Sequence, residues 1–191
     1  MNGDPMSIDW LSLHGTAHDE FGARLAAVTD WSAPTPDTEW NTHQLVQHVI
    51  EEQQWVPLLL EGRTVRDAHP LIRPLGDDLI GEWHRYSAAA ASAWAKAAPE
   101  TPVHVSYGTI PASEYLREQV SDVTIHTWDL AKATHSSDSI DPALIEAVYT
   151  VFEPQKDTLE ASGLFASPVP IADDAPLQSR LLALTGRDDR E

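Results

Sequence analysis

Apolar side chains recur every three or four residues over most of this chain, which is the spacing that places them on one face of an α-helix. Prolines break helix interiors, and they divide this pattern into a few long windows. The strongest window runs from Glu114 to Thr134, after the potential cap Ser113, and its apolar stripe consists of Leu116, Val120, Val123, Thr127 and Leu130. The chain is therefore predicted to fold mainly as α-helices.

The same spacing and the capping residues predict the other helices. Their ranges are Ile8–Val28, a helix that begins at Asn41 or Thr42 and runs through Val56, Asp77–Ala97, and Asp141–Phe152. Pro57 is expected to kink or end the second of these, and a short helix over 176–187 is expected to close on Gly186. Residues 103–107 alternate in polarity and suit either a strand or an extended loop. We predict an all-α fold, a four-helix bundle with short additional C-terminal helices, as one domain spanning 1–191.

Composition and charge exclude several classes of partner and of functional site. The 191 residues include 30 acidic and 12 basic ones, giving a formal charge of −18, which argues against nucleic acid or an anionic membrane as partner. There is no cysteine, so disulfides, thiolate metal sites and a cysteine nucleophile are excluded. No apolar run approaches the ~20 residues that cross a bilayer, and the first five residues lack the pattern of a signal peptide. A soluble, cytoplasmic protein is expected.

The nine histidines are the residues most capable of chemistry. Asp122 and His126 are four residues apart in the strongest helix, so they project side by side and suit a divalent metal, although an exposed pair with this spacing can also be a simple surface contact. A third ligand has to come from another helix. His48 is the best candidate because it lies on the inward face of the second helix, where the alternative is a core histidine. Glu52, one turn further on, either orients His48 or lies at the rim.

The remaining histidines are weaker candidates. His14 and His18 form another pair four residues apart and are a rival site. His43 diverges from His48 around the helix axis. We assign no role to the other four, which are His69, His84, His104 and His135. A set of two histidines and one carboxylate leaves coordination positions open, as in a reactive metal site, and zinc is the first choice with nickel or iron(II) as alternatives.

Three segments resemble a known family. They are Trp40–Val49, Asp122–Ala131 and Leu181–Arg187, and the chain is similar through them to the DinB/YfiT-like superfamily, most closely to the actinobacterial metal-binding proteins related to the N-terminal domain of mycothiol-dependent maleylpyruvate isomerase. The resemblance implies a four-helix bundle with one divalent metal held by His48, Asp122 and His126. The isomerase pattern has Glu where this chain has the shorter Asp122. Asp129 is expected to contact a ligand or substrate or to serve helix packing, and Arg187 to bind an anion or to form a salt bridge.

Two functions of different classes follow. The first is a metal-dependent transferase or isomerase in which a low-molecular-weight thiol such as mycothiol binds the metal as a cosubstrate and attacks a small electrophile. The second is a non-catalytic bundle that binds a metal or a ligand. In a third hypothesis, His48, Asp122 and His126 bind no metal and only form hydrogen bonds with each other. The partners expected are a small-molecule substrate or thiol, and a second copy of the chain in a homodimer.

Overall fold

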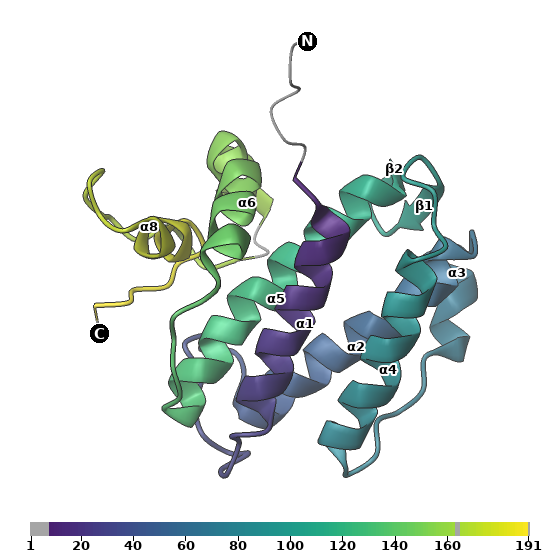
Figure 1. Ribbon diagram of the computed structural model, residues 1–191, viewed down its shortest axis with the longest axis horizontal. Helices are drawn as coiled ribbons and strands as arrows, with labels where there is room; N and C mark the ends of the chain where they lie inside the picture. The colour runs from purple at the N-terminus through teal and green to yellow at the C-terminus, as the bar shows by residue number, and fades with distance from the viewer. Residues whose placement is uncertain (1–7, 163–164, 191) are drawn as a thin grey trace.

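Four long helices form the body of the protein in the computed structural model, which describes residues 8–162 and 165–190 (Figure 1). They are α1 (Trp10–Leu25), α2 (Thr42–Leu60), α4 (Leu79–Trp94) and α5 (Ala112–Thr134). Helix α1 packs against α5 and α4, and α2 packs against the same two helices, so the four close into a ring. The predicted all-α, DinB-like four-helix bundle is confirmed.

The helix starts are set by local capping bonds, and the one at Asn41 is one of the two alternatives that the sequence predicts for α2. Asn41 and Gln44 form a reciprocal capping box at the start of α2, with the Gln44 backbone N–H donating to Asn41 Oδ1 at 3.0 Å. Asp78 Oδ1 accepts from the Gly81 backbone N–H at 3.0 Å at the start of α4, and Asp9 caps α1 in the same way. These bonds satisfy backbone donors that the first helical turn leaves unpaired.

The start of α5 differs from the prediction of a Ser113 cap. Residues 102–111 form a hairpin of β1 (Pro102–Val105) and β2 (Gly108–Pro111), which resolves the alternating stretch as a strand. Strand β2 leads directly into α5, so Pro111 occupies the cap position without a side-chain bond. The Ser113 backbone N–H donates instead to the Pro99 carbonyl at 2.9 Å. Pairing of the hairpin therefore decides where α5 begins.

Pro57 does not end α2, which continues to Leu60 with the proline inside it. A proline lacks the N–H that would bond to the carbonyl four residues earlier, so α2 continues without that one backbone hydrogen bond. Both Val56 and Leu59 are buried on either side of Pro57. The following connection also contains a short helix and a 3₁₀ turn that the sequence reading missed, α3 (Val65–Ala68) and η1 (His69–Leu71).

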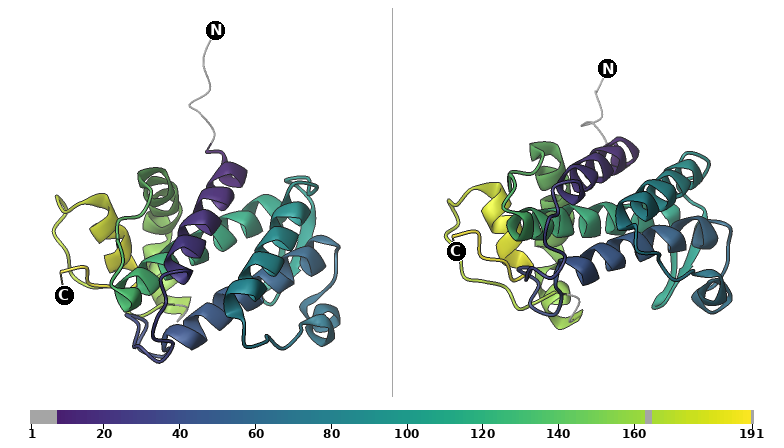
Figure 2. Two further views of the ribbon diagram at one scale, coloured as in Figure 1. Left: turned by 60° about the horizontal axis from the view of Figure 1, so that its bottom comes forward. Right: turned by 90° about the horizontal axis from the view of Figure 1, so that it is seen from below.

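The C-terminal elements cover one side of the bundle. They are α6 (Pro142–Phe152), η2 (Glu153–Gln155), α7 (Lys156–Ser162) and α8 (Leu177–Leu184). Figure 2 shows α6 and α8 together on one side, away from the hairpin. Gly186 follows α8 with φ +78°, the left-handed conformation that glycine adopts readily, as the predicted glycine cap requires. The short additional C-terminal helices are confirmed.

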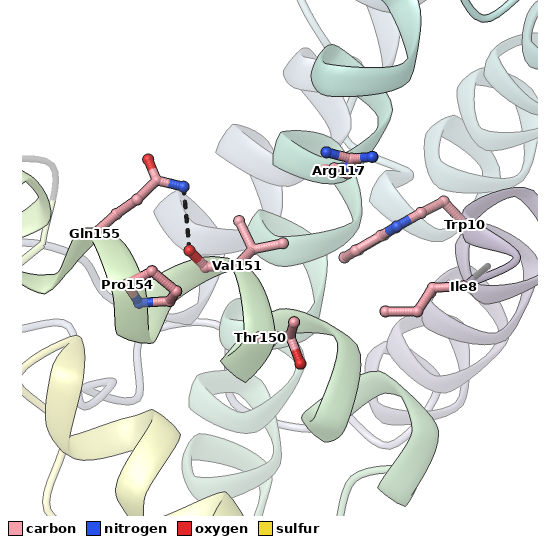
Figure 3. A pocket seen from close by; sticks show the side chains of 7 residues that line it. All are labelled: Ile8, Trp10, Arg117, Thr150, Val151, Pro154 and Gln155. Carbon is pink, nitrogen blue, oxygen red and sulfur yellow. Dashed lines mark hydrogen bonds between the residues drawn. The ribbon is translucent and has the colours of Figure 1, made fainter. Parts of the chain in front are cut away.

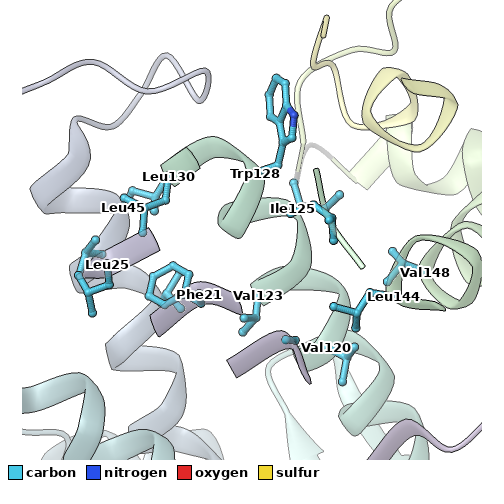
Figure 4. Packing of buried hydrophobic residues seen from close by; sticks show 14 of the residues in the cluster. Phe21, Leu25, Leu45, Val120, Val123, Ile125, Trp128, Leu130, Leu144 and Val148 are labelled. Carbon is cyan, nitrogen blue, oxygen red and sulfur yellow. The ribbon is translucent and has the colours of Figure 1, made fainter. Parts of the chain in front are cut away.

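The core consists of two apolar clusters. The larger joins α1, α2 and α5 to α6 and α8 and includes Phe21, Leu45, Val120, Trp128 and Leu144 (Figure 4). The smaller lies toward the hairpin and includes Val56, Trp94, Val103 and Tyr115. Along α2 and α5 the buried amides Gln53 and Gln119 fall between members of the two clusters, so a polar layer separates them. In residues 8–162 and 165–190, no helix has the length and apolar character to cross a membrane.

Candidate metal centre

Asp122 lies between the two histidines that the sequence assigned to it. Its Oδ2 is 3.6 Å from His48 Nε2, and its Oδ1 is 3.4 Å from His126 Nε2. His48 comes from the middle of α2, whereas Asp122 and His126 lie one turn apart on α5, so the contact between these two helices brings the three together. Their ligand atoms all lie within 4.8 Å of one another. The three predicted residues therefore do converge.

The spacing of these atoms is longer than that of a charged hydrogen bond, which is about 2.7–2.9 Å. Two ligands that each lie about 2.1 Å from a tetrahedral zinc ion are about 3.4 Å apart. The observed 3.4 Å from Oδ1 to His126 and 3.6 Å from Oδ2 to His48 are each close to that separation, although they start from different oxygens of Asp122. Asp122 Oδ2 is also buried without a hydrogen-bond partner among the residues the structure describes. The donor set therefore fits a cation shared by three ligands, and the shorter Asp122 side chain reaches both histidines.

The centre lies at the boundary between core and solvent. The His126 side chain is 4% exposed, whereas His48 and Asp122 are 29% and 27% exposed. His126 is therefore buried, whereas parts of the His48 and Asp122 side chains meet solvent.

Charges around His126 favour its protonated form. Burial disfavours the imidazolium, but the Asp122 and Asp129 carboxylates outweigh it and raise the pKa of His126 to about 10. The pKa of Asp122 is held well below its usual range by the same histidines against the opposing effect of burial. Burial also acts to lower the pKa of His48, but the Asp122 carboxylate outweighs this effect, and the pKa of His48 is raised. A cation at this position would replace protons on the imidazoles.

Asp129 orients the buried ligand. It is fully buried, and its Oδ2 lies 3.0 Å from His126 Nδ1. Burial raises the pKa of Asp129, but hydrogen bonds from His126 and Arg187 outweigh this effect and lower it, so the carboxylate is ionised and Nδ1 must be the donor. That leaves His126 Nε2 facing Asp122. This contact fixes the orientation of the His126 ring, as carboxylate–histidine pairs do in metal sites, and a contact of Asp129 with a ligand or substrate stays a prediction.

Arg187, near the C-terminal end of the sequence, forms an ion pair with Asp129. Its Nε donates to Asp129 Oδ1 at 3.1 Å and its Nη2 to Oδ2 at 2.7 Å, a bidentate pair in which both residues are buried. Nη2 also contacts Asp37 Oδ2 at 3.3 Å. Arg187 thus forms the salt bridge that the sequence offered as one of two roles. The cluster of Asp37, His126 and Asp129 also satisfies the spacing of a metal site, but the guanidinium already supplies the positive charge there.

Trp40 covers the two histidines of the centre, a role that the sequence reading did not assign. Its ring centroid is 4.5 Å from that of His48 and 5.6 Å from that of His126. The loop before α2 holds Trp40 in place, because Thr35 Oγ1 donates to the Trp40 carbonyl at 2.8 Å. The position of Trp40 in the sequence could have indicated this contact, because Trp40 directly precedes the Asn41 cap and so lies about two helical turns from His48.

The other candidates lie outside the centre. Glu52 accepts a hydrogen bond from Gln119 Nε2 at 3.4 Å, and none from His48 is present among the described residues. Burial and the nearby Asp122 raise the pKa of Glu52. His14 and His18 are buried against each other on α1, with ring centroids 3.9 Å apart. His43 contacts Trp31 instead of the cluster.

Two open grooves flank the start of α1 at a distance from the three ligands. Figure 3 shows one of about 440 Å³, in which the Arg117 guanidinium lies 5.9 Å from the Trp10 ring. The other, of about 520 Å³, also borders Trp10 and is lined by Leu11, Trp94 and Leu116 among others. None of the three metal-ligand candidates lines either groove.

Comparison with known proteins relates this chain to a described family. Residues 14–131 match the family model described as mycothiol maleylpyruvate isomerase N-terminal domain. Two uncharacterised proteins of Mycobacterium tuberculosis, from strains CDC 1551 / Oshkosh and ATCC 25618 / H37Rv, are each 31% identical over 193 residues, covering 96% of this chain and 100% of theirs. The matched family segment contains all three candidate ligands.

Two solved structures share the fold. A crystal structure of the mycothiol-dependent maleylpyruvate isomerase has a TM-score of 0.69 and 17% identity, covering 95% of this chain and 90% of that one. A structure of a histidine-to-alanine mutant of that isomerase has a TM-score of 0.71 and 16% identity, covering 97% and 91%. At such identities the likeness establishes the bundle and its C-terminal elements, and the family match carries the relationship. This chain belongs to the family of the mycothiol maleylpyruvate isomerase N-terminal domain.

Proposed function

We propose that this chain is a cytoplasmic, divalent-metal-binding bundle that uses a low-molecular-weight thiol of the mycothiol type to transfer or isomerise a small electrophile. Zinc is the first choice of metal, with nickel and iron(II) as alternatives. The ligands proposed are His48, Asp122 and His126. The thiol is taken from the family to which the chain belongs and from the name of the isomerase that shares its fold.

One observation supports the metal proposal: Asp122 faces both histidines, with Oδ1 3.4 Å from His126 Nε2 and Oδ2 3.6 Å from His48 Nε2, and one ligand atom from each of the three residues lies within 4.8 Å of the other two. A bound divalent metal would lower the pKa of a coordinated thiol and so supply a thiolate near neutral pH. The chain has no cysteine, so the nucleophile has to be brought by a second molecule. Three protein ligands leave room for it.

The surrounding residues prepare the site for this chemistry. Asp129 accepts a hydrogen bond from His126 Nδ1 and so fixes the orientation of the His126 ring. Arg187 in turn balances the negative charge of Asp129. Trp40 covers the imidazoles and excludes water from one side of them. The partly exposed His48 and Asp122 leave the approach for thiol and electrophile on the other side.

The metal proposal is tested on protein purified without a histidine tag. We expect close to one equivalent of bound metal in the wild type, a large loss in Asp122→Asn, which keeps the shape of the side chain, and a loss in His126→Ala. His84→Ala on the exposed face of α4 is the matched control and should keep the metal. Equal metal contents in all four folded proteins would refute the site.

The enzyme proposal is tested next with a panel of thiols, mycothiol included, and the electrophile monochlorobimane. Conjugation that needs the added metal and disappears in Asp122→Asn would support a thiol transferase. Metal binding without conjugation by any thiol would instead favour the second class, a non-catalytic metal- or ligand-binding bundle. The two measurements therefore separate the metal site from its use.

A further inference from the structure

The groove of about 440 Å³ beside the start of α1 falls within the usual size of a small-molecule pocket, which is about 300–1,000 Å³. The Trp10 ring extends from α1 toward α6, and Arg117 of α5 lies beside it (Figure 3). The opposite wall comes from the end of α6 and from η2, through Thr150, Val151, Pro154 and Gln155. Three separate parts of the bundle therefore enclose one groove with largely apolar walls.

The charge of this groove differs from that of the whole molecule. The chain has 30 acidic and 12 basic residues, yet Arg117 is the one charged side chain among the described residues that line the groove. Glu118, its neighbour on α5, accepts a hydrogen bond from the Tyr107 hydroxyl. Within residues 8–162 and 165–190, no carboxylate forms an ion pair with Arg117. The groove is therefore locally positive in a protein whose net charge is −18.

Trp10 positions the Arg117 guanidinium at the groove. The Arg117 Cζ lies over the Trp10 ring, 5.9 Å from its centroid, a distance at which an indole attracts a cation. This contact uses no N–H···O hydrogen bond, so it leaves the N–H donors of Arg117 available. Those donors form a planar fork that matches the two oxygens of a carboxylate. The arrangement suits an anion that carries an apolar group.

The groove and the candidate metal centre lie on different faces of α5. Arg117 and Asp122 are five residues apart on this helix, so their side chains are about 140° apart around its axis. Asp122 faces His48 of α2, whereas Arg117 contacts Trp10 of α1. A molecule in the groove therefore occupies a site of its own, and its binding does not depend on the function proposed for the centre.

We propose that this groove binds an aromatic monocarboxylate. The carboxylate accepts hydrogen bonds from Arg117, and the ring packs beside Trp10 and the apolar wall of Val151 and Pro154. One guanidinium balances one negative charge. A phosphate or a dicarboxylate would keep an uncompensated charge, which the −18 net charge of the protein would repel.

The test is titration of the full chain with 2-naphthoate, after treatment with a chelator so that no metal at the centre binds the carboxylate. Nitrogen-15 NMR should show a saturable shift of the Trp10 indole N–H, assigned with Trp10→Phe. Arg117→Gln should weaken binding by more than about tenfold, because hydrogen bonds to a charged group are lost. Arg85→Gln is the matched control and should leave binding unchanged, since Arg85 is also exposed and lies over a ring, 5.1 Å from the centroid of Tyr86.

A second pair of variants changes the charge of the groove without altering Arg117. Thr150 is exposed and lines the groove, so Thr150→Glu places a carboxylate near Arg117 and should abolish binding, whereas Thr150→Gln, of equal size, should retain it. The neutral 2-naphthalenemethanol and the aliphatic octanoate should each bind at least several-fold more weakly than 2-naphthoate. The proposal is overturned if the Trp10 signal does not saturate, if Arg117→Gln binds as tightly as the wild type, or if either analogue matches 2-naphthoate.

Discussion

Replacement of Arg187 by leucine is the sharpest test of the buried network behind the candidate metal centre. Arg187 is 4% exposed and Asp129 is fully buried, and the two are joined by hydrogen bonds of 3.1 and 2.7 Å. Arg187→Leu keeps apolar volume but leaves the Asp129 carboxylate with His126 as its remaining charged partner. It also releases Asp37, which contacts the same guanidinium.

The expected loss follows from the cost of an uncompensated buried charge. Removing one partner of a buried ion pair costs about 3–5 kcal/mol. For a chain of this size each kcal/mol lowers Tm by about 2–4 °C, so Arg187→Leu should lower Tm by roughly 6–20 °C. The matched control is Arg63→Leu, whose exposed ion pair with Glu61 should contribute about 0.5 kcal/mol or less.

The assay is urea unfolding followed by far-ultraviolet circular dichroism. The double variant Asp129→Asn/Arg187→Leu should lose less stability than the sum of the two single variants, by about 0.5–3 kcal/mol, because the second change removes the charge that the first leaves unpaired. If Arg187→Leu costs no more than Arg63→Leu, or if the two changes are additive, the network does not carry the charge balance inferred from its geometry.

Three further predictions concern the same region and the chain terminus. In metal-free protein the raised pKa of His126 contributes to stability in full below pH 6.5, the pKa of the unfolded state, and this contribution is lost as the pH rises toward about 10. The Tm of the wild type should therefore fall between these two pH values. An equal fall in His126→Gln would contradict the assignment. Zinc at about 100 times its Kd should raise the free energy of unfolding by about 2.7 kcal/mol in the wild type, with proton release measurable by calorimetry in two buffers. The same addition should leave His48→Ala almost unchanged, and equal stabilisation of both proteins would exclude His48 as a ligand. Gly186→Ala should destabilise the protein by about 1–3 kcal/mol in urea unfolding, because φ is +78° and the added Cβ would lie 2.5 Å from Ala166 Cβ, and an unchanged midpoint would refute this reading.

The sequence was most informative where interactions are local. Helix periodicity predicted α5 and its buried stripe, and the caps at Asn41 and Asp141 marked the starts of α2 and α6. The spacing of Asp122 and His126 placed them side by side because one helical turn fixes their relation. Where a neighbouring element intervened, local reasoning was wrong: after the hairpin, α5 begins at Ala112 with Pro111 in the cap position, and not at Glu114 with a Ser113 cap.

By itself, then, the sequence determined the helices, their apolar faces and the pairs four residues apart, since each depends on neighbours within one or two turns. Spacing alone does not distinguish the pair His14 and His18 from Asp122 and His126, and the sequence favoured the second pair because of its place beside the apolar stripe of its helix. Only the tertiary structure showed that the first pair packs against the rings of Trp83 and Trp94 while the second meets His48. It likewise brought Arg187 to Asp129, 58 residues away, because packing of whole helices, and not local spacing, sets which distant charges meet in the core.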